Sequence, residues 1–167
     1  MNVALLIIDM QKLYINSMKN RESVETAIEH INYVADILRK LNQPVVLIQD
    51  MESYSDERKE EFETIDEIIV SPNDVHLQKI HSNSFWETEL EKILRDRDVG
   101  FVIVTGFSAE YCVLFTYQGA KERGFKAAIL KDAILSKNED TVIAAYRDRE
   151  IISYSAVEYF LSQGIDK

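Results

Sequence analysis

Three residues of the sequence could together form a nucleophilic site: Cys112, Asp9 and Lys79. Cys112 is the only cysteine, and it closes the stretch VTGFSAEYC a few residues after an apolar run. Asp9 follows six consecutive apolar residues, so its carboxylate is desolvated and costly unless a cation pairs with it. Lys79 lies at the end of another predicted strand, a weaker one than the others, and could supply that cation. In such a set the thiol attacks a carbonyl carbon, the carboxylate takes the thiol proton, and the ammonium keeps the carboxylate ionised.

Each of these residues also has a purely structural interpretation. A lone cysteine is most often a small buried hydrophobe, a strand-terminal aspartate most often caps a turn or helix, and most lysines are solvated. The position of Cys112 favours chemistry, because the first turn of a helix offers free N–H groups and a dipole that stabilise a thiolate. The same N–H groups could hold the oxyanion of a tetrahedral intermediate.

The elements that must position these residues are strands buried on both faces, which read as continuous apolar runs. The polar residues that follow such strands meet at the carboxyl edge of a parallel sheet. The predicted strands are Val3–Ile8, Pro44–Gln49, Val75–Lys79, Val99–Thr105, Lys126–Leu130 and Ile151–Ser155.

Helical patterns alternate with these runs, which indicates right-handed βαβ crossovers. We therefore predict an α/β fold, a three-layer αβα arrangement around a six-stranded, mostly parallel sheet. Ser84 and Glu87 form a capping box that predicts a helix start. The predicted helices are Val24–Leu41, Ser84–Leu94, Ala109–Gly124, Glu139–Arg147 and Ala156–Gln163.

The segment Met51–Glu67 does not fit this alternation, since it is too polar to bury and too long for an ordinary crossover loop. We interpret it as a solvated charged excursion or short surface helix. A lid over the site is the alternative.

Composition limits the classes of function. A chain of 167 residues with 46% apolar content predicts one domain, residues 1–167. The net charge of -10 disfavours nucleic acid and anionic membranes as partners. A single cysteine cannot form an intrachain disulfide, and the N-terminal apolar run is too short to span a membrane, so we expect a cytoplasmic protein. None of the five glycines forms G-x-G-x-x-G or a P-loop, which disfavours a nucleotide-binding Rossmann domain.

Four segments in order carry a family resemblance that covers nearly the whole chain. The segments are ALLIIDMQKLY, LQKIHSNSFWETEL, VIVTGFSAEYCVLFTYQGAKERGF and AAILKDAI. They resemble the isochorismatase-like cysteine hydrolases, which include nicotinamidases, N-carbamoylsarcosine amidase and ureidoacrylate amidase. Asp9, Gln11 and Tyr14 follow the family's D-x-Q-x-x-F pattern, and Lys79 and Phe85 follow its K-x-x-x-S-A-F pattern.

The resemblance implies a role for each candidate residue. Asp9 takes the thiol proton, Cys112 attacks the substrate carbonyl, and Lys79 sits beside both, after which water releases the acyl group from a thioester. The resemblance also implies a cis peptide bond between Phe107 and Ser108, and an oxyanion held by the backbone N–H groups of Ser108 and Cys112.

The same resemblance leads us to expect no metal and no cofactor. Nicotinamidases carry D-x-H after the second strand, whereas this chain reads Asp50-Met-Glu. His30, His76 and His81 are not placed to replace the missing histidine, although His81 could approach the site.

Two positions leave the family pattern beside the cysteine. Ala109 stands for the usual threonine and Glu110 for the usual aspartate, so the local hydrogen bonding must differ. Candidate pocket residues are Gln11, Tyr14, Phe85, Trp86, Phe107 and Tyr111. Aromatic side chains in helices can equally be core or subunit contacts.

The leading hypothesis is a metal-independent cysteine hydrolase that cleaves a C–N bond in a small amide or ureido compound. The first alternative is an isochorismatase that cleaves a vinyl ether, a reaction that does not require the thiol. The second alternative is a catalytically silent protein that binds a ligand or partner. The resemblance further implies a homo-oligomer, either a dimer or a tetramer.

Overall fold

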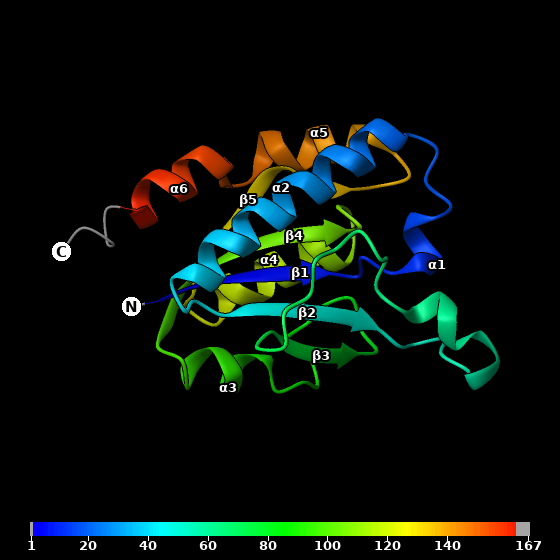
Figure 1. The fold of residues 1–167 in the computed structure, drawn as a ribbon, viewed down its shortest axis with the longest axis horizontal. Helices are drawn as coiled ribbons and strands as arrows, with labels where there is room; N and C mark the ends of the chain where they lie inside the picture. The colour runs from blue at the N-terminus through cyan, green and yellow to red at the C-terminus, as the bar shows by residue number, and fades with distance from the viewer. Residues whose placement is uncertain (1, 163–167) are drawn as a thin grey trace.

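The computed structural model describes residues 2–162, and its centre is one six-stranded sheet (Figure 1). The strands lie in the order β3-β2-β1-β4-β5-β6, and every neighbouring pair is parallel. The predicted parallel sheet is therefore confirmed. The strands are β1 (Asn2–Ile8), β2 (Val45–Asp50), β3 (Val75–Lys79), β4 (Val99–Phe107), β5 (Lys126–Leu135) and β6 (Ile151–Ile152).

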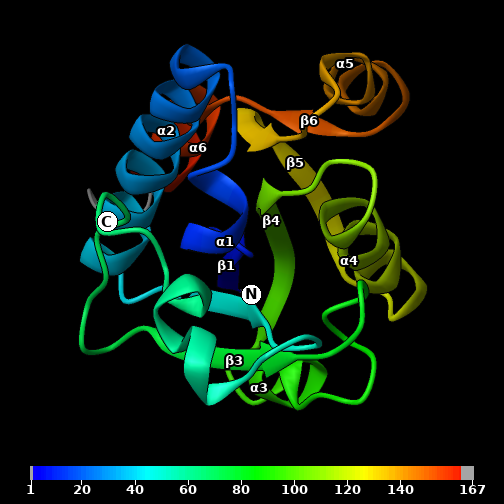
Figure 2. The same cartoon turned by 90° about the vertical axis from the view of Figure 1, so that its right-hand side faces the viewer.

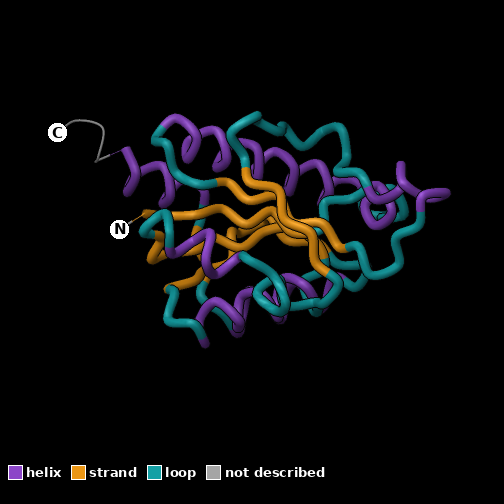
Figure 3. The backbone as a smooth tube through the Cα atoms, turned by 90° about the horizontal axis from the view of Figure 1, so that it is seen from below, coloured by secondary structure: helices purple, strands orange, loops and turns teal. Residues whose placement is uncertain are grey.

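Helices cover both faces of the sheet, which confirms the three-layer αβα prediction (Figures 2 and 3). The helices α2 and α6 pack on one face, and α3, α4 and α5 on the other. The helices are α1 (Lys12–Ile15), α2 (Arg21–Lys40), α3 (Leu90–Arg95), α4 (Cys112–Glu122), α5 (Glu139–Asp148) and α6 (Tyr154–Ser162), with a 3-10 helix η1 (Asp56–Phe62). No helix within residues 2–162 combines the length and the apolar character that crossing a membrane requires.

The central strand β1 shows why the sequence folds this way. Leu5 and Ile7 pack on the α2 side, whereas Leu6 and Ile8 pack on the α4 side, because successive side chains of a strand point to opposite faces. All four side chains are buried. A strand apolar on both faces must lie inside the sheet, and this holds Asp9 at the carboxyl edge between β2 and β4.

The helix predicted for Ser84–Leu94 is wrong over its first half, since α3 begins only at Leu90. The Ser84 hydroxyl does not cap a helix but lies 2.7 Å from the Thr116 hydroxyl of α4. Glu87 has a φ of 54°, which lies outside the right-handed helical region. A buried tertiary hydrogen bond has therefore replaced the local capping box.

The acidic segment Met51–Glu67 is mostly exposed and contains the 3-10 helix η1, so the predicted short surface helix is confirmed, although two buried residues anchor the segment. Phe62 and Ile65 are buried, and the Ile65 N–H donates to the Met10 carbonyl at 2.9 Å. Apolar residues such as Phe62 and Ile65 pack against the protein, while the charged residues between them face water. The segment lies with α1 near the carboxyl ends of β1 and β2 (Figure 1).

Other boundaries differ by a few residues. β5 continues to Leu135, with a register shift where Lys131 and Asp132 leave the ladder. The final strand stops at Ile152 because α6 begins at Tyr154. The last residue of the helix predicted for Ala156–Gln163 lies outside the described residues.

Candidate active site

The three predicted catalytic residues meet at the carboxyl edge of the sheet. Lys79 Nζ lies 2.9 Å from Asp9 Oδ2 and 3.3 Å from Cys112 Sγ. Asp9 is 1% exposed, Lys79 2% and Cys112 9%. A carboxylate, an ammonium and a thiol thus form one contact cluster that is nearly sealed from water.

The backbone around Asp9 and Cys112 is tightly constrained. Asp9 has a φ of 50°, and its N–H donates to the Ile48 carbonyl at 2.9 Å, which turns the chain sharply at the end of β1. Gly106 pairs with Ile8 in the β1–β4 ladder and has a φ of 104°, a conformation that favours glycine. The β1–β4 ladder holds the ends of these two strands side by side, and α4 then begins at Cys112 itself.

The loop between β4 and α4 is held by hydrogen bonds to the end of β5, to the residue that follows it and to the first turn of α5. The Phe107–Ser108 peptide bond is cis, and the Ala109 N–H donates to the Leu135 carbonyl at 2.8 Å. The Glu110 carboxylate accepts hydrogen bonds from the Ser136 hydroxyl at 3.0 Å and the Thr141 hydroxyl at 3.4 Å. Glu110, one of the two departures from the family pattern, therefore tethers the loop that carries the cysteine. The oxyanion role of the Ser108 and Cys112 N–H groups stays a prediction.

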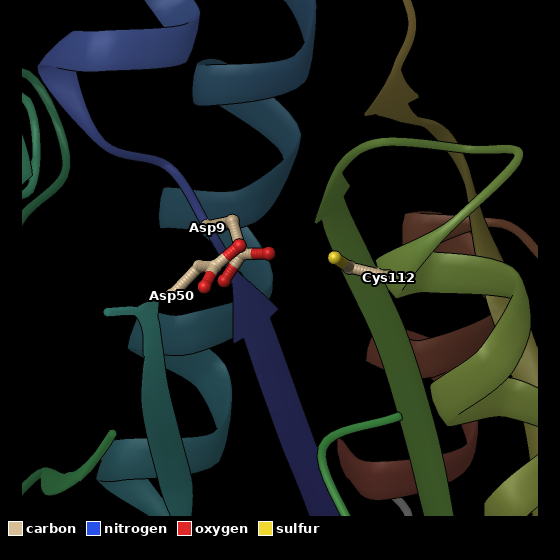
Figure 4. Close-up of side chains that lie close together, drawn as sticks. All are labelled: Asp9, Asp50 and Cys112. Carbon is tan, nitrogen blue, oxygen red and sulfur yellow. The ribbon is translucent and has the colours of Figure 1, made fainter. Parts of the chain in front are cut away.

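A second carboxylate, Asp50, joins the cluster and was not among the predicted site residues (Figure 4). Its Oδ2 lies 3.9 Å from Lys79 Nζ, and the Tyr14 hydroxyl donates to the same oxygen at 3.1 Å. One side-chain ligand atom from each of Asp9, Asp50 and Cys112 lies within 4.8 Å of the others. The signal for Asp50 was present in the sequence, because it follows the predicted strand Pro44–Gln49, and β2 lies beside β1.

The same three side chains are of types that can bind a metal ion, but Lys79 lies among them. Its ammonium is within 3.9 Å of an atom of each: Asp9, Asp50 and Cys112. A divalent ion placed there would meet a positive charge at close range, and the residues therefore fit an ammonium better than a metal.

Burial decides the protonation of the cluster. It raises the pKa of Asp9 to about 6, although the charge of Lys79 partly opposes this shift. It also raises the pKa of the Cys112 thiol to about 12, with the negative charge of Asp9 acting in the same direction. The sequence-based expectation that the helix N-terminus stabilises a thiolate is therefore wrong for the resting protein. At neutral pH the cluster holds a thiol, a carboxylate and an ammonium.

Lys79 keeps its charge despite its burial. Burial by itself lowers the pKa of a lysine, but the charges of Asp9, Cys112 and Asp50 together raise the pKa of Lys79 above its usual value. The ammonium is thus a permanent positive charge between two carboxylates.

Two predicted pocket residues turn out to be structural. Gln11 is buried, and its amide accepts the Asp50 N–H at 2.9 Å and donates to the Asp50 carbonyl at 3.0 Å. Phe85 is buried in the core, where its ring stacks on Phe125 with centroids 5.9 Å apart. Both predictions are corrected, because these side chains have fixed partners inside the protein.

The remaining candidates lie at or near the surface. Tyr14 and Phe107 are half-buried and stack on each other with ring centroids 5.2 Å apart, so they form one aromatic wall beside Asp50. Trp86 and Tyr111 are exposed. His81 is bound to Glu87 at 3.1 Å rather than to the site.

Comparison with known proteins identifies the family. The isochorismatase domain family matches residues 3–154. The chain is 28% identical over 151 residues to the uncharacterized isochorismatase family protein YaaI of Bacillus subtilis (strain 168), with 82% of each chain covered.

Solved structures share the fold. N-carbamoylsarcosine amidase from Thermoplasma acidophilum has a TM-score of 0.78 at 24% identity, over 92% of this chain and 97% of that one. The nicotinamidase from Staphylococcus aureus has a TM-score of 0.75 at 21% identity, over 88% of this chain and 93% of that one. Since the family match spans β1 to the start of α6 and includes Asp9, Lys79 and Cys112, this chain belongs to the isochorismatase family of hydrolases.

Proposed function

We propose that this protein is a cysteine hydrolase that cleaves a C–N bond in a small amide or ureido compound without a metal ion. The observation that carries the proposal is the position of Lys79 Nζ, in contact with both the Asp9 carboxylate and the Cys112 sulfur. An amidase and a nicotinamidase among the structural neighbours support the same reaction class.

The first half of the reaction is the transfer of the acyl group to the enzyme. Asp9 accepts the thiol proton as Cys112 Sγ bonds to the substrate carbonyl carbon, and the backbone N–H groups of Ser108 and Cys112 hold the resulting oxyanion. The C–N bond then breaks, and the proton on Asp9 passes to the leaving nitrogen. A thioester and a free amine or ammonia result.

The second half regenerates the thiol. Water attacks the thioester carbonyl while Asp9 accepts a proton from it, and collapse of the intermediate releases the acid and returns a proton to the sulfur. Lys79 stabilises the ionised form of Asp9 at the two points where that residue must act as a base.

The site offers less support for cleavage of isochorismate, which carries two carboxylates. Asp50 adds a second negative charge beside Asp9. The ammonium of Lys79 is already paired with these two carboxylates and is therefore not free to bind the carboxylates of a substrate. A doubly anionic substrate would be repelled from this edge of the sheet.

A panel of small amides and ureides, assayed for release of ammonia, tests the proposal. We expect turnover of at least one compound by the native protein, a thioester adduct on Cys112 in the mass spectrum, and loss of both in Cys112→Ala. The substitution removes only the sulfur of a small side chain, so a thermal melting curve should show a folded protein. Equal turnover by Cys112→Ala and the native protein would reject a cysteine mechanism.

The pH dependence of the reaction follows from Asp9. Because burial raises the pKa of Asp9 to about 6, and Asp9 must be ionised to accept the thiol proton, kcat/KM should fall as the pH drops below about 6. The negative charge of Asp50 contributes to that raised pKa, so Asp50→Asn should move the acidic limb to lower pH. A pH–rate profile of the two proteins checks both points, and an unmoved limb would contradict the coupling.

A further inference from the structure

Asp50 has no step in the reaction described above, yet the chain fixes its position closely. Gln11 binds both backbone groups of Asp50. The side chain accepts the Glu52 N–H at 3.0 Å through Oδ1 and the Tyr14 hydroxyl at 3.1 Å through Oδ2. An ionised carboxylate offers about four acceptor positions, so these two hydrogen bonds leave Asp50 able to accept more.

The cluster is short of hydrogen-bond donors. Asp9 Oδ1 is buried and has no hydrogen-bond partner among the described residues. Two carboxylates share the single ammonium of Lys79, which leaves one surplus negative charge. The Asp50 side chain is 15% exposed against 1% for that of Asp9, so Asp50 is the carboxylate that an entering ligand meets. A ligand that brings N–H groups would supply what the cluster lacks.

The distances allow one substrate nitrogen to reach Asp50 while its carbonyl carbon reaches the sulfur. A carbon poised for attack lies about 3 to 3.5 Å from Sγ. Its amide nitrogen lies about 1.33 Å further on, and an N–H···O bond adds about 2.9 Å. An Asp50 carboxylate oxygen and Cys112 Sγ are at most 4.8 Å apart. This separation is shorter than the sum of the three lengths, so a bent arrangement of sulfur, carbonyl carbon, nitrogen and oxygen can join the two residues.

We infer that Asp50 is a specificity-determining residue that accepts an N–H from the scissile nitrogen of the substrate. The substrates are then amides or ureides whose scissile nitrogen carries at least one hydrogen, whereas esters and N,N-disubstituted amides lack the required donor. This inference rests on the proposed function, because it places a carbonyl group over Cys112. In the reaction, Asp50 holds the nitrogen while Asp9 delivers the proton to it.

Alkylation of Cys112 tests this inference without knowledge of the substrate. Iodoacetamide carries an NH2 group, and 2-iodo-N,N-dimethylacetamide carries none. With both reagents the sulfur bonds to the CH2 carbon, iodide leaves, and the thiol proton passes to the solvent or a base. The amide nitrogen is then one C–C bond, about 1.5 Å, further from the sulfur than in an amide substrate, which the span of at most 4.8 Å to Asp50 still allows. Both reagents are neutral, so the charge of the chain does not distinguish them. Cys112 is the only cysteine, and intact mass therefore reports its rate directly. The reference is the rate with iodoacetamide divided by the rate with 2-iodo-N,N-dimethylacetamide in the urea-unfolded chain, which gives the intrinsic difference between the reagents.

We expect the folded native protein to prefer iodoacetamide by about 10- to 100-fold over that reference, the usual size of a hydrogen bond to a charged group. Asp50→Asn should lose most of this preference, because its one acceptor oxygen is occupied by the Glu52 N–H and an NH2 group stands where the other oxygen was, while the shape is conserved. Glu52→Gln is the matched control, since it removes an exposed neighbouring charge and should keep the preference. Tyr14→Phe should keep it also, because the Asp50 carboxylate remains.

Each outcome either supports or overturns the role of Asp50 in binding the N–H group. An unchanged ratio in Asp50→Asn overturns the inference, and a loss in Tyr14→Phe equal to that in Asp50→Asn assigns the recognition to the phenol instead. Alkylation requires no turnover, so the proposed function can fail separately. A ratio that depends on Asp50 in a protein that releases no ammonia from any amide would keep the subsite and reject the hydrolase.

Discussion

Asp9→Asn is expected to lower turnover by about 10²- to 10⁴-fold, the usual contribution of a positioned general base, while making Cys112 easier to alkylate. Burial is the main reason for the raised pKa of the Cys112 thiol, and the negative charge of Asp9 is the next. Once that charge is removed, Lys79 still lies 3.3 Å from the sulfur and favours the thiolate. Turnover and thiol reactivity should therefore move in opposite directions.

The measurement is kcat/KM on the best amide of the panel together with the rate of iodoacetamide labelling between pH 6 and pH 10. Asp36→Asn, an exposed surface change of the same chemistry, should alter neither quantity. Slower labelling of Asp9→Asn than of the native protein would show that Asp9 promotes the thiolate in the resting site, contrary to the electrostatics described above.

Gly106→Ala is expected to destabilise the protein by about 3 kcal/mol or more, or to prevent folding. A Cβ at this position would lie 2.0 Å from the Ile8 carbonyl oxygen, a backbone atom that cannot move without breaking the β1–β4 ladder. The φ of 104° adds conformational strain for any residue with a side chain. Ile8 directly precedes Asp9, so any relief of the clash would also shift the Asp9 carboxylate relative to Cys112.

Gly124→Ala separates the two causes. Gly124 also has a positive φ, of 82°, but a Cβ there meets nothing within 4 Å. The Gly124→Ala variant should therefore lose only the free energy of the backbone strain, about 1 to 2 kcal/mol of unfolding free energy. Urea unfolding of the two variants gives the difference. Equal losses of stability in both would mean that the Ile8 contact is relieved at little cost.

The sequence predicted the sheet and the cluster of Asp9, Lys79 and Cys112 for the same reason. Strands buried on both faces must be apolar throughout, so their ends are marked by the first polar residue. Asp9 lies at such an end, Lys79 ends the more polar edge strand β3, and Cys112 lies a few residues beyond β4. Parallel strands bring these ends to one edge, and the order of the elements then suffices to bring the three residues together.

What the sequence could not predict depends on partners far away in the chain. Ser84 looked like a helix cap until Thr116, on α4, was seen to bond it. Gln11 looked free to contact a substrate, but Asp50 binds its amide twice. Local patterns do not reveal such tertiary hydrogen bonds, and a buried partner outweighs a local propensity.

The protonation of the cysteine was beyond the sequence for a related reason. A helix N-terminus and a lysine both argue for a thiolate, and both are local or motif-level features. The burial of Cys112 and the proximity of Asp9 oppose them, and these two quantities depend on the whole fold. Their balance could be judged only after the distances and the exposure were known.

The carboxylate pair of Asp9 and Asp50 also bears on how the catalytic cycle ends. Hydrolysis of an amide turns a neutral acyl group into an acid whose usual pKa is about 4, and which is therefore an anion at neutral pH. That anion forms beside the carboxylates of Asp9 and Asp50 and the ammonium of Lys79. The Lys79 nitrogen lies 2.9 Å from the Asp9 carboxylate and 3.9 Å from the Asp50 carboxylate. In the proposed reaction, the site that holds the neutral substrate would repel the finished acid, so the charge that the reaction creates would favour product release.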